Sequence, residues 1–341
     1  MKKYFFLISV AALAMTACTN ESEEYVGSQE SKEIAFMPIA QPSTRSAVDV
    51  TNTGVFPTTS TMQVAAYDAE AGANYFAPAT FSNVAETATW TGGKYWPLSP
   101  ATLNFLAYAE FVAGTDGTVT WNATNPASDV TFVMSDNSTR QTDLMYACGT
   151  GTVSQTSNTL SFPTSDQVAM VFKHAQALII FNVVGNATAV TSGLTINDIT
   201  LNSVSCNGTY AVTHANWNKT KAQRDAADPA GSLNGSVSGT WSAYGDGSDI
   251  TAVVSAGYSA LTTSSQEYGT LMVVPNKGIA SFTIHYSLGG NNYAYTYTPA
   301  STSLAQATKY IYNITLNVHE IIVAPTVENW GNGSTVSPTV G

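Results

Sequence analysis

Apolar and polar residues alternate over short stretches through most of this chain, and apolar residues at helical spacing are nearly absent. A period of two places successive side chains on opposite faces of a β-strand, so the pattern indicates strands that bury one face. Turn-prone pairs such as Asn207-Gly208 and Gly289-Gly290 separate these stretches. Many short strands joined by tight turns predict an all-β fold made of β-sandwiches.

The alternation predicts individual strands along the whole chain. The stretch Ala215–Ala226 has mixed charge and is predicted as either a short helix or a loop. The expected strands are Ile34–Ile39, Met62–Tyr67, Thr102–Phe111, Thr118–Trp121, Val130–Met134, Asp143–Ala147, Thr159–Phe162, Val168–His174, Ala177–Val184, Leu194–Leu201, Gly208–Val212, Ile250–Val254, Leu271–Val274, Ala280–Ser287, Asn292–Thr298, Tyr310–Val318 and Ile321–Val327.

The length indicates two domains. The chain has 341 residues, and domains typically contain roughly 100–200 residues each. A polar, turn-prone stretch, Pro163–Asp166, precedes a strongly apolar pair of expected strands. We therefore expect one domain over residues 46–167 and a second over residues 168–319, with a C-terminal segment at 320–341.

The first residues read as a secretory signal. Lys2 and Lys3 precede an apolar run from Tyr4 to Ala14, and small residues follow up to Cys18. The run is shorter than the ~20 residues that span a bilayer. The small residues before Cys18 resemble a bacterial lipobox, which implies a signal peptide over residues 1–17 and lipidation of the Cys18 thiol. The alternative is an ordinary signal peptide with an incidental cysteine.

The composition narrows the possible partners. Only 10% of the residues are charged, and 12 Lys and Arg face 23 Asp and Glu. Such a chain has no basic stripe to neutralise phosphates, so nucleic acid is an unfavourable partner. Cys148 and Cys206 show no metal-ligand or redox spacing. An oxidising compartment permits a bridge between them, but we favour two separate buried thiols.

Eight short motifs follow one another along nearly the whole chain. They are Ile34-Ala35-Phe36, Thr44-Arg45-Ser46, Lys94-Tyr95-Trp96-Pro97, Leu103-Asn104-Phe105-Leu106-Ala107-Tyr108, Thr142-Asp143-Leu144-Met145-Tyr146-Ala147, Val171-Phe172-Lys173-His174-Ala175-Gln176-Ala177-Leu178, Lys309-Tyr310-Ile311-Tyr312-Asn313-Ile314-Thr315-Leu316 and Val327-Glu328-Asn329-Trp330. Each motif is mainly an apolar strand pattern, whereas their order is more specific. Taken in this order, the motifs resemble those of the fimbrillins, the type V pilins and their relatives in Bacteroides and Porphyromonas.

This resemblance implies a fold and a path of export, processing and assembly. The fold would be two transthyretin-like, Greek-key β-sandwiches in tandem. The precursor would reach the outer membrane as a lipoprotein, and an Arg-specific protease would cut between Arg45 and Ser46 to remove a leader over residues 18–45. The mature chain would join other fimbrial subunits head to tail in a cell-surface fimbrium that supports adhesion to a host or bacterial receptor.

A cut after Arg45 would have a structural consequence for the first domain. If the strand at Ile34–Ile39 pairs into the first domain, a cut after Arg45 severs it from that domain. Its departure leaves unpaired backbone groups and open apolar pockets, which is costly unless another strand fills the groove. A strand from a neighbouring subunit can do so by β-augmentation. A head-to-tail contact of this kind does not close, so a filament follows.

The C-terminal segment is the expected donor. Ile321, Val323 and Val327 alternate with other residues after the strand at Tyr310–Val318, and Thr335–Val340 adds a second apolar stretch. Pro325 and Pro338 discourage a central position in the segment's own sheet. The alternative is that residues 320–341 simply complete the second sandwich.

No enzymatic machinery is visible. The four histidines, His174, His214, His285 and His319, lack metalloprotease spacing, and no serine lies in a nucleophile-elbow motif. We expect His174 to be a hydrogen-bonded core residue, and we assign no metal and no cofactor. The alternative function is a lipid-anchored surface adhesin or fimbrial tip or accessory protein. It would bind glycan or host protein without polymerising, through exposed aromatic residues such as Trp217, Trp241 or Tyr244.

Overall fold

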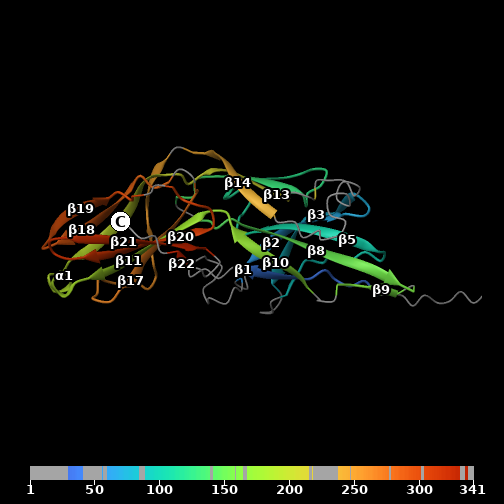
Figure 1. Cartoon of the computed structure of the whole chain (residues 1–341), viewed down its shortest axis with the longest axis horizontal. Helices are drawn as coiled ribbons and strands as arrows, with labels where there is room; N and C mark the ends of the chain where they lie inside the picture. Colours follow the sequence, from blue (N-terminus) through green and yellow to red (C-terminus); the bar gives the residue numbers. More distant parts are fainter. Residues whose placement is uncertain are drawn as a thin grey trace, which may run out of the picture. The chain divides into compact units, whose positions relative to one another are not determined.

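A computed structural model of the chain describes residues 30–40, 56, 60–83, 89–138, 141–157, 159–163, 167–214, 217, 237–245, 247–275, 278–300, 303–330 and 335–336. Strands dominate these residues, which confirms the all-β prediction (Figure 1). The strands are β1 (Phe36–Ala40), β2 (Thr61–Asp68), β3 (Ala73–Asn83), β4 (Trp90–Thr91), β5 (Ala101–Ala109), β6 (Gly117–Trp121), β7 (Asp129–Met134), β8 (Met145–Thr156), β9 (Thr159–Ser161), β10 (Val168–His174), β11 (Ala177–Gly185), β12 (Thr195–Val204), β13 (Gly208–His214), β14 (Val237–Tyr244), β15 (Ser248–Thr251), β16 (Val253–Val254), β17 (Gln266–Val273), β18 (Ser281–Leu288), β19 (Asn291–Tyr297), β20 (Thr308–Leu316), β21 (Ile321–Asn329) and β22 (Thr335–Val336).

Two long strands and one helix were missed by the sequence patterns. β3 contains Pro78 and pairs with β2 through register shifts, so its alternation is broken. β14 contains Gly239, where a Cβ atom would collide with the Tyr210 ring. Helix α1 (Ala187–Thr191) begins where the Asn186 side chain accepts a hydrogen bond from the Ala189 N–H. The helix or loop expected at 215–226 lies outside the described residues, apart from Trp217.

The first sheet closes on itself. Its strands follow the order β10-β1-β4-β3-β2-β5-β8-β9, and β10 also pairs with β8. The strands from β10 round to β8 therefore form a ring, and closing a sheet removes its unpaired edges. β1, in blue, lies beside β10, in green (Figure 1). A closed sheet replaces the simple sandwich expected in the first half of the chain.

Both faces of the first sheet are buried at β5. Leu103, Phe105 and Ala107 pack into the core inside the ring, while Leu106 and Tyr108 pack on the other side. This double burial explains why β5 reads as an almost continuous apolar run.

A separate sheet, β14-β13-β7-β6, covers the outer face of β5 and β8. β6 and β7 come from the first half of the sequence, and β13 and β14 come from the second half. β13 pairs antiparallel with β7 and so joins the two pairs of strands into one sheet. In addition, β10 belongs to the first sheet. These two sheets therefore contain strands from both sides of residue 167, where the sequence predicts a domain boundary. Hydrogen bonding between strands far apart in the sequence decides which sheet each strand joins.

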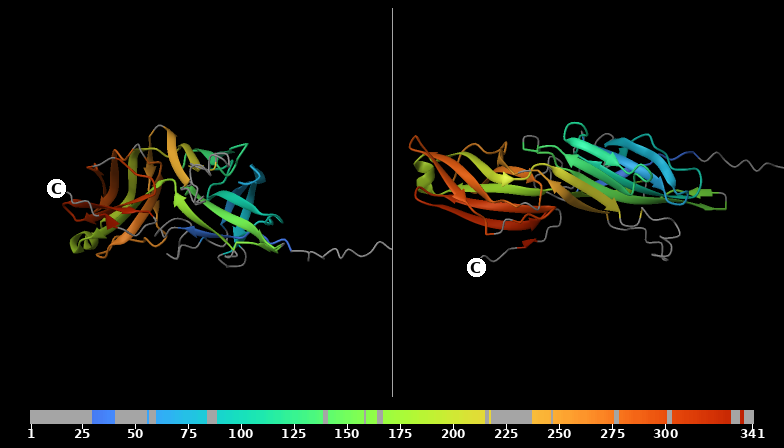
Figure 2. Two further views of the ribbon diagram at one scale, coloured as in Figure 1. Left: turned by 45° about the vertical axis from the view of Figure 1, so that its right-hand side comes forward. Right: turned by 90° about the horizontal axis from the view of Figure 1, so that it is seen from above.

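The remaining strands form two sheets that share a second core. One sheet has the order β16-β17-β11-β20-β21-β22, and the other has the order β15-β12-β18-β19. Phe181, Phe282 and Tyr312 meet in the core between them. The red strands of the C-terminal part run next to the yellow-green strand β11 in both views of Figure 2, as the β11–β20 pairing requires. In the described residues no helix has the length and hydropathy needed to cross a membrane.

Candidate assembly interface at the leader strand and the C-terminal strand

The leader strand is β1 together with Ile34 and Ala35, which precede it. Its side chains form part of the first core. Ile34 and Phe36 are fully buried. The Phe36 ring meets the Phe81 ring edge to face at 4.9 Å and the Phe105 ring at 5.0 Å. Burying a phenylalanine side chain stabilises a fold by about 1.5–3 kcal/mol. The expected strand at Ile34–Ile39 is therefore confirmed, as β1 begins at Phe36 and Ile34 extends the buried pattern.

The backbone of β1 closes the ring of the first sheet. Five residues of β1 pair in parallel with β10, from Phe36↔Val168 to Ala40↔Phe172. On its other side, Phe36 pairs with Trp90 of β4, and the Ile34 N–H donates to the Lys94 carbonyl at 2.7 Å. Removing β1 would open the ring between β10 and β4.

The processing and lipidation residues predicted from the sequence cannot be placed. Cys18, Arg45 and Ser46 lie outside the described residues, which in this region are 30–40. They remain predictions.

The expected donor residues lie at the edge of the second core. Ile321, Val323 and Val327 belong to β21, which pairs antiparallel with β20 over nine residues, from Leu316↔Ile321 to Thr308↔Asn329. Ile321 and Val323 are half-buried against the second core. β21 thus occupies a place in its own sheet in this chain.

The outer edge of β21 is nearly bare in the described residues. Trp330 donates its backbone N–H to the Ala307 carbonyl, and Glu320 accepts from the Asn317 N–H. Even-numbered backbone groups therefore face β20, because pairing alternates along an antiparallel strand. Pro325 faces the outer edge, where a missing N–H costs no ladder bond. Only Val327 and Glu328 pair with β22.

A stacked pair of rings fixes the end of β21. The Trp330 indole lies parallel to the His174 imidazole, with the ring centroids 3.7 Å apart and an interplanar angle of 9°. Nδ1 of His174 is 3.0 Å from both carboxylate oxygens of Asp143, and both side chains are 1% exposed. His174 is therefore a hydrogen-bonded core residue, as expected. The stack joins the end of β21 to the end of β10.

The aromatic residues named for the adhesin alternative do not form an exposed surface. Trp217 is 1% exposed and stacks on His214, while Trp241 is 5% exposed and donates its indole N–H to the Ala175 carbonyl at 2.7 Å. The Tyr244 hydroxyl donates to the Trp241 carbonyl. That prediction was wrong, because these side chains fill the core under the sheet containing β13 and β14.

Cys148 and Cys206 are both free thiols, as preferred, but only Cys206 is fully buried, whereas Cys148 is partly buried. Burial, together with the smaller effect of the Asp136 charge, raises the pKa of the Cys206 thiol to about 12. The thiolate is the reactive form, so a raised pKa suppresses reaction at neutral pH.

This burial predicts slow modification of Cys206. In the folded chain at pH 8, iodoacetamide should label it roughly 10³-fold more slowly than in the urea-unfolded chain, since the thiolate fraction falls by that factor. The rate should rise with pH up to the raised pKa. Peptide mapping after timed labelling measures it. Equal rates in the folded and unfolded chains would contradict the burial.

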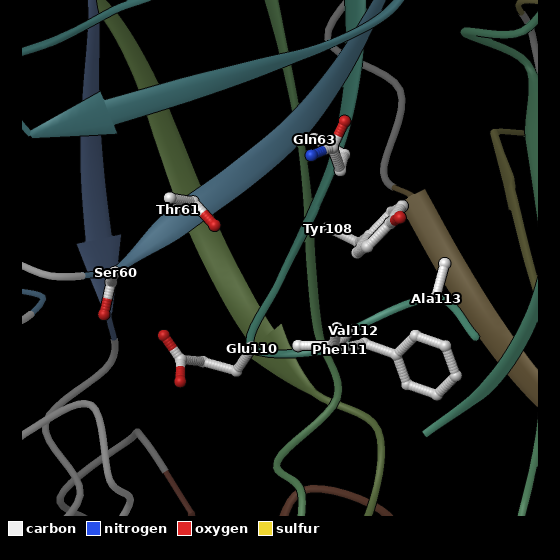
Figure 3. A pocket seen from close by; sticks show the side chains of 8 residues that line it. All are labelled: Ser60, Thr61, Gln63, Tyr108, Glu110, Phe111, Val112 and Ala113. Atoms are coloured by element: carbon white, nitrogen blue, oxygen red, sulfur yellow. The ribbon is translucent and has the colours of Figure 1, made fainter. Parts of the chain in front are cut away.

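An open pocket of about 630 Å³ lies between the start of β2 and the segment after β5. Ser60, Gln63 and Tyr108 line it with Glu110, whose carboxylate lies on the Ser60 side (Figure 3). Burial raises the pKa of Glu110, although the Ser60 hydroxyl lowers it. Glu110 has a φ of 63°, an uncommon conformation for a residue with a side chain. In the part of the chain that is described, no three His, Cys, Asp or Glu side chains gather as a metal site would need.

Comparison with known proteins decides the family. Residues 44–330 match the sequence model of a family described as fimbrillin-like. The chain belongs to the fimbrillin-like family. No curated protein matches its sequence significantly. The description of the family names a fimbrial protein rather than an enzyme.

Solved structures share the fold of this fimbrillin-like chain. A candidate cell adhesion protein from Bacteroides uniformis is 16% identical with a TM-score of 0.52, and the match covers 87% of this chain and 98% of that one. A candidate cell adhesion protein from Bacteroides ovatus is 13% identical with a TM-score of 0.52, covering 89% of this chain and 99% of that one. At these identities the likeness concerns the fold.

Proposed function

We propose that this fimbrillin-like protein is a stalk-type subunit of a type V fimbria that polymerises by donor-strand exchange after cleavage between Arg45 and Ser46. The precursor is exported as a lipoprotein, acylated at Cys18 and held at the outer membrane. After processing, the subunit leaves the lipid anchor with its leader and enters a cell-surface fimbrium. Its partners are other fimbrial subunits, an Arg-specific protease and a receptor that the fibre contacts.

One observation carries this proposal: β1 is a buried strand of the first sheet, and it precedes Arg45 in the sequence. Ile34 and Phe36 are fully buried, and β1 pairs on both sides. A cut after Arg45 turns β1 into a separate peptide held only by noncovalent contacts. An incoming strand can then replace it, pair with β10 and refill the core.

The donor in this proposal is the segment 320–341. It contains Ile321, Val323 and Val327 in β21 and continues past Trp330 to Thr335–Val340. In the described residues most outer backbone groups of β21 lack a strand partner, apart from Val327 and Glu328, which pair with β22, and such an edge is suited to strand addition. The alternative, an adhesin that does not polymerise, loses support because Trp217 and Trp241 are buried.

Limited digestion tests the proposal. The purified precursor is treated with an Arg-specific protease, and the product is analysed by intact mass and by size-exclusion chromatography over a range of concentrations. We expect a cut after Arg45 that yields the chain 46–341 and oligomers that grow with concentration. A cut product that stays monomeric at every concentration would favour an anchored surface lipoprotein instead.

A further inference from the structure

The leader strand defines what its groove accepts. Ile34 and Phe36 are buried in the first core and Pro38 is buried as well. On the opposite face of the strand, Ala35 is buried and Met37 is partly buried. The core side of the groove therefore takes apolar side chains at every second position and tolerates a proline two residues after the Phe36 position. A replacement strand must reproduce this pattern.

The backbone explains why a proline fits there. The Ala35 carbonyl accepts from the Val168 N–H of β10, and the Ile34 N–H donates toward Lys94. The backbone groups alternate along a strand, so Pro38 faces the β4 side, as Ile34 does. The described pairing between β1 and β4 consists of Phe36↔Trp90. Pro38 follows this pair, so its missing N–H removes no described ladder bond.

The C-terminal segment repeats this pattern twice. The leader strand has the sequence Phe36-Met37-Pro38-Ile39-Ala40. The segment contains Val323-Ala324-Pro325-Thr326-Val327 and then Val336-Ser337-Pro338-Thr339-Val340. Both copies place a proline two residues after an apolar residue. Either copy matches the leader strand in proline position and apolar spacing.

The first copy is already engaged in its own chain. It lies within β21, whose nine residues pair with β20. Trp330 follows it, is 1% exposed and stacks on His174. Releasing β21 would break this pairing and expose the indole. The second copy follows Trp330, and its described residue Val336 pairs only with Val327.

We infer that the second copy, Val336–Val340, is the part of the donor that enters the groove of a neighbouring copy of this chain. It runs parallel to the neighbour's β10, with Val336 at the position of Phe36 and Pro338 at the position of Pro38. This inference rests on the proposed function and adds the register. Ile321, Val323 and Val327 then stay in β21 and support the donor from the edge of its own sheet.

The register predicts which substitutions matter. Val336 faces the neighbour's core and Ser337 faces away, as Phe36 and Met37 do in the leader strand. Val336 is also smaller than the phenylalanine it replaces, so the occupied groove has room to spare. Val336→Phe should fill it and slow the dissociation of fibres in denaturant by roughly tenfold, about the effect of a few buried methylene groups.

The test compares two charge substitutions one residue apart. Val336→Asp and Ser337→Asp are each cut with the Arg-specific protease, and thermal melting confirms that both monomers fold. We expect Val336→Asp to lower the yield of oligomers at least roughly tenfold, because an unpaired carboxylate would enter the core. Ser337→Asp should stay within about twofold of wild type.

The outcomes distinguish failure of the proposed function from failure of the proposed register alone. Wild-type chain that remains monomeric after the cut overturns the proposed function, and this inference with it. Wild-type fibres together with normal fibres from Val336→Asp overturn the register alone, as does equal loss in both variants. Faster dissociation of Val336→Phe fibres than of wild-type fibres also contradicts the assignment of Val336 to the Phe36 position.

Discussion

Replacing Arg45 with Ala is expected to keep the leader strand in place and to abolish fibre formation. A protease pocket built to hydrogen-bond an arginine rejects a side chain that lacks those groups by on the order of 10⁴-fold. With the chain intact, β1 stays tethered in its groove between β10 and β4, so no acceptor site opens. Intact mass after digestion and electron microscopy of the product measure both effects.

The matched control is Arg224→Ala, the same change at another arginine of the chain. It should leave cleavage after Arg45 and fibre length unchanged. Fibres of normal length from the Arg45→Ala variant would show that assembly does not need cleavage after Arg45. Equal melting temperatures of the two precursors are needed to show that neither change acts through folding.

Two truncations of the C-terminal segment are expected to behave differently. Removing residues 331–341 leaves β21 and Trp330 in place, so the monomer should melt near the wild-type temperature but fail to extend a fibre. Removing residues 320–341 deletes a strand of nine paired residues and the buried Trp330. Loss of a buried tryptophan side chain alone costs about 3–5 kcal/mol, a large share of a typical stability of about 5–15 kcal/mol.

Thermal and urea unfolding of both truncated chains measure this difference. The variant Trp330→Ala isolates the contribution of the ring stack with His174, because it keeps every backbone pair of β21. A truncation at residue 320 as stable as the one at residue 331 would show that β21 adds little to its own sheet. The first copy of the repeated motif would then become available as a donor.

The sequence was most informative where burial acts on one strand at a time. The alternation in β10 and β7 follows from one face packing on a core, which is a local property of the chain. The same argument predicts the strand at Ile34–Ile39, in which Ile34 and Phe36 are buried in the first core.

What could not be predicted depends on contacts between distant residues. Nothing local to β1 indicates that it pairs in parallel with β10 and closes a ring. Likewise, β13 gives no local sign that it pairs with β7. The indole of Trp241 resembles an exposed binding residue in a polar stretch, yet it reaches the Ala175 carbonyl in a core. His174 and Trp330 belong to separate motifs, and only the fold brings them into contact.

Native mass spectrometry of the first oligomers formed after cleavage tests strand exchange most directly. Each junction should replace one leader peptide with one donor segment. A dimer should therefore have the mass of two cleaved chains plus a single retained leader peptide, held in the one groove that no donor has filled. A dimer that retains both leader peptides would show that subunits associate without strand exchange and would contradict assembly by donor-strand exchange.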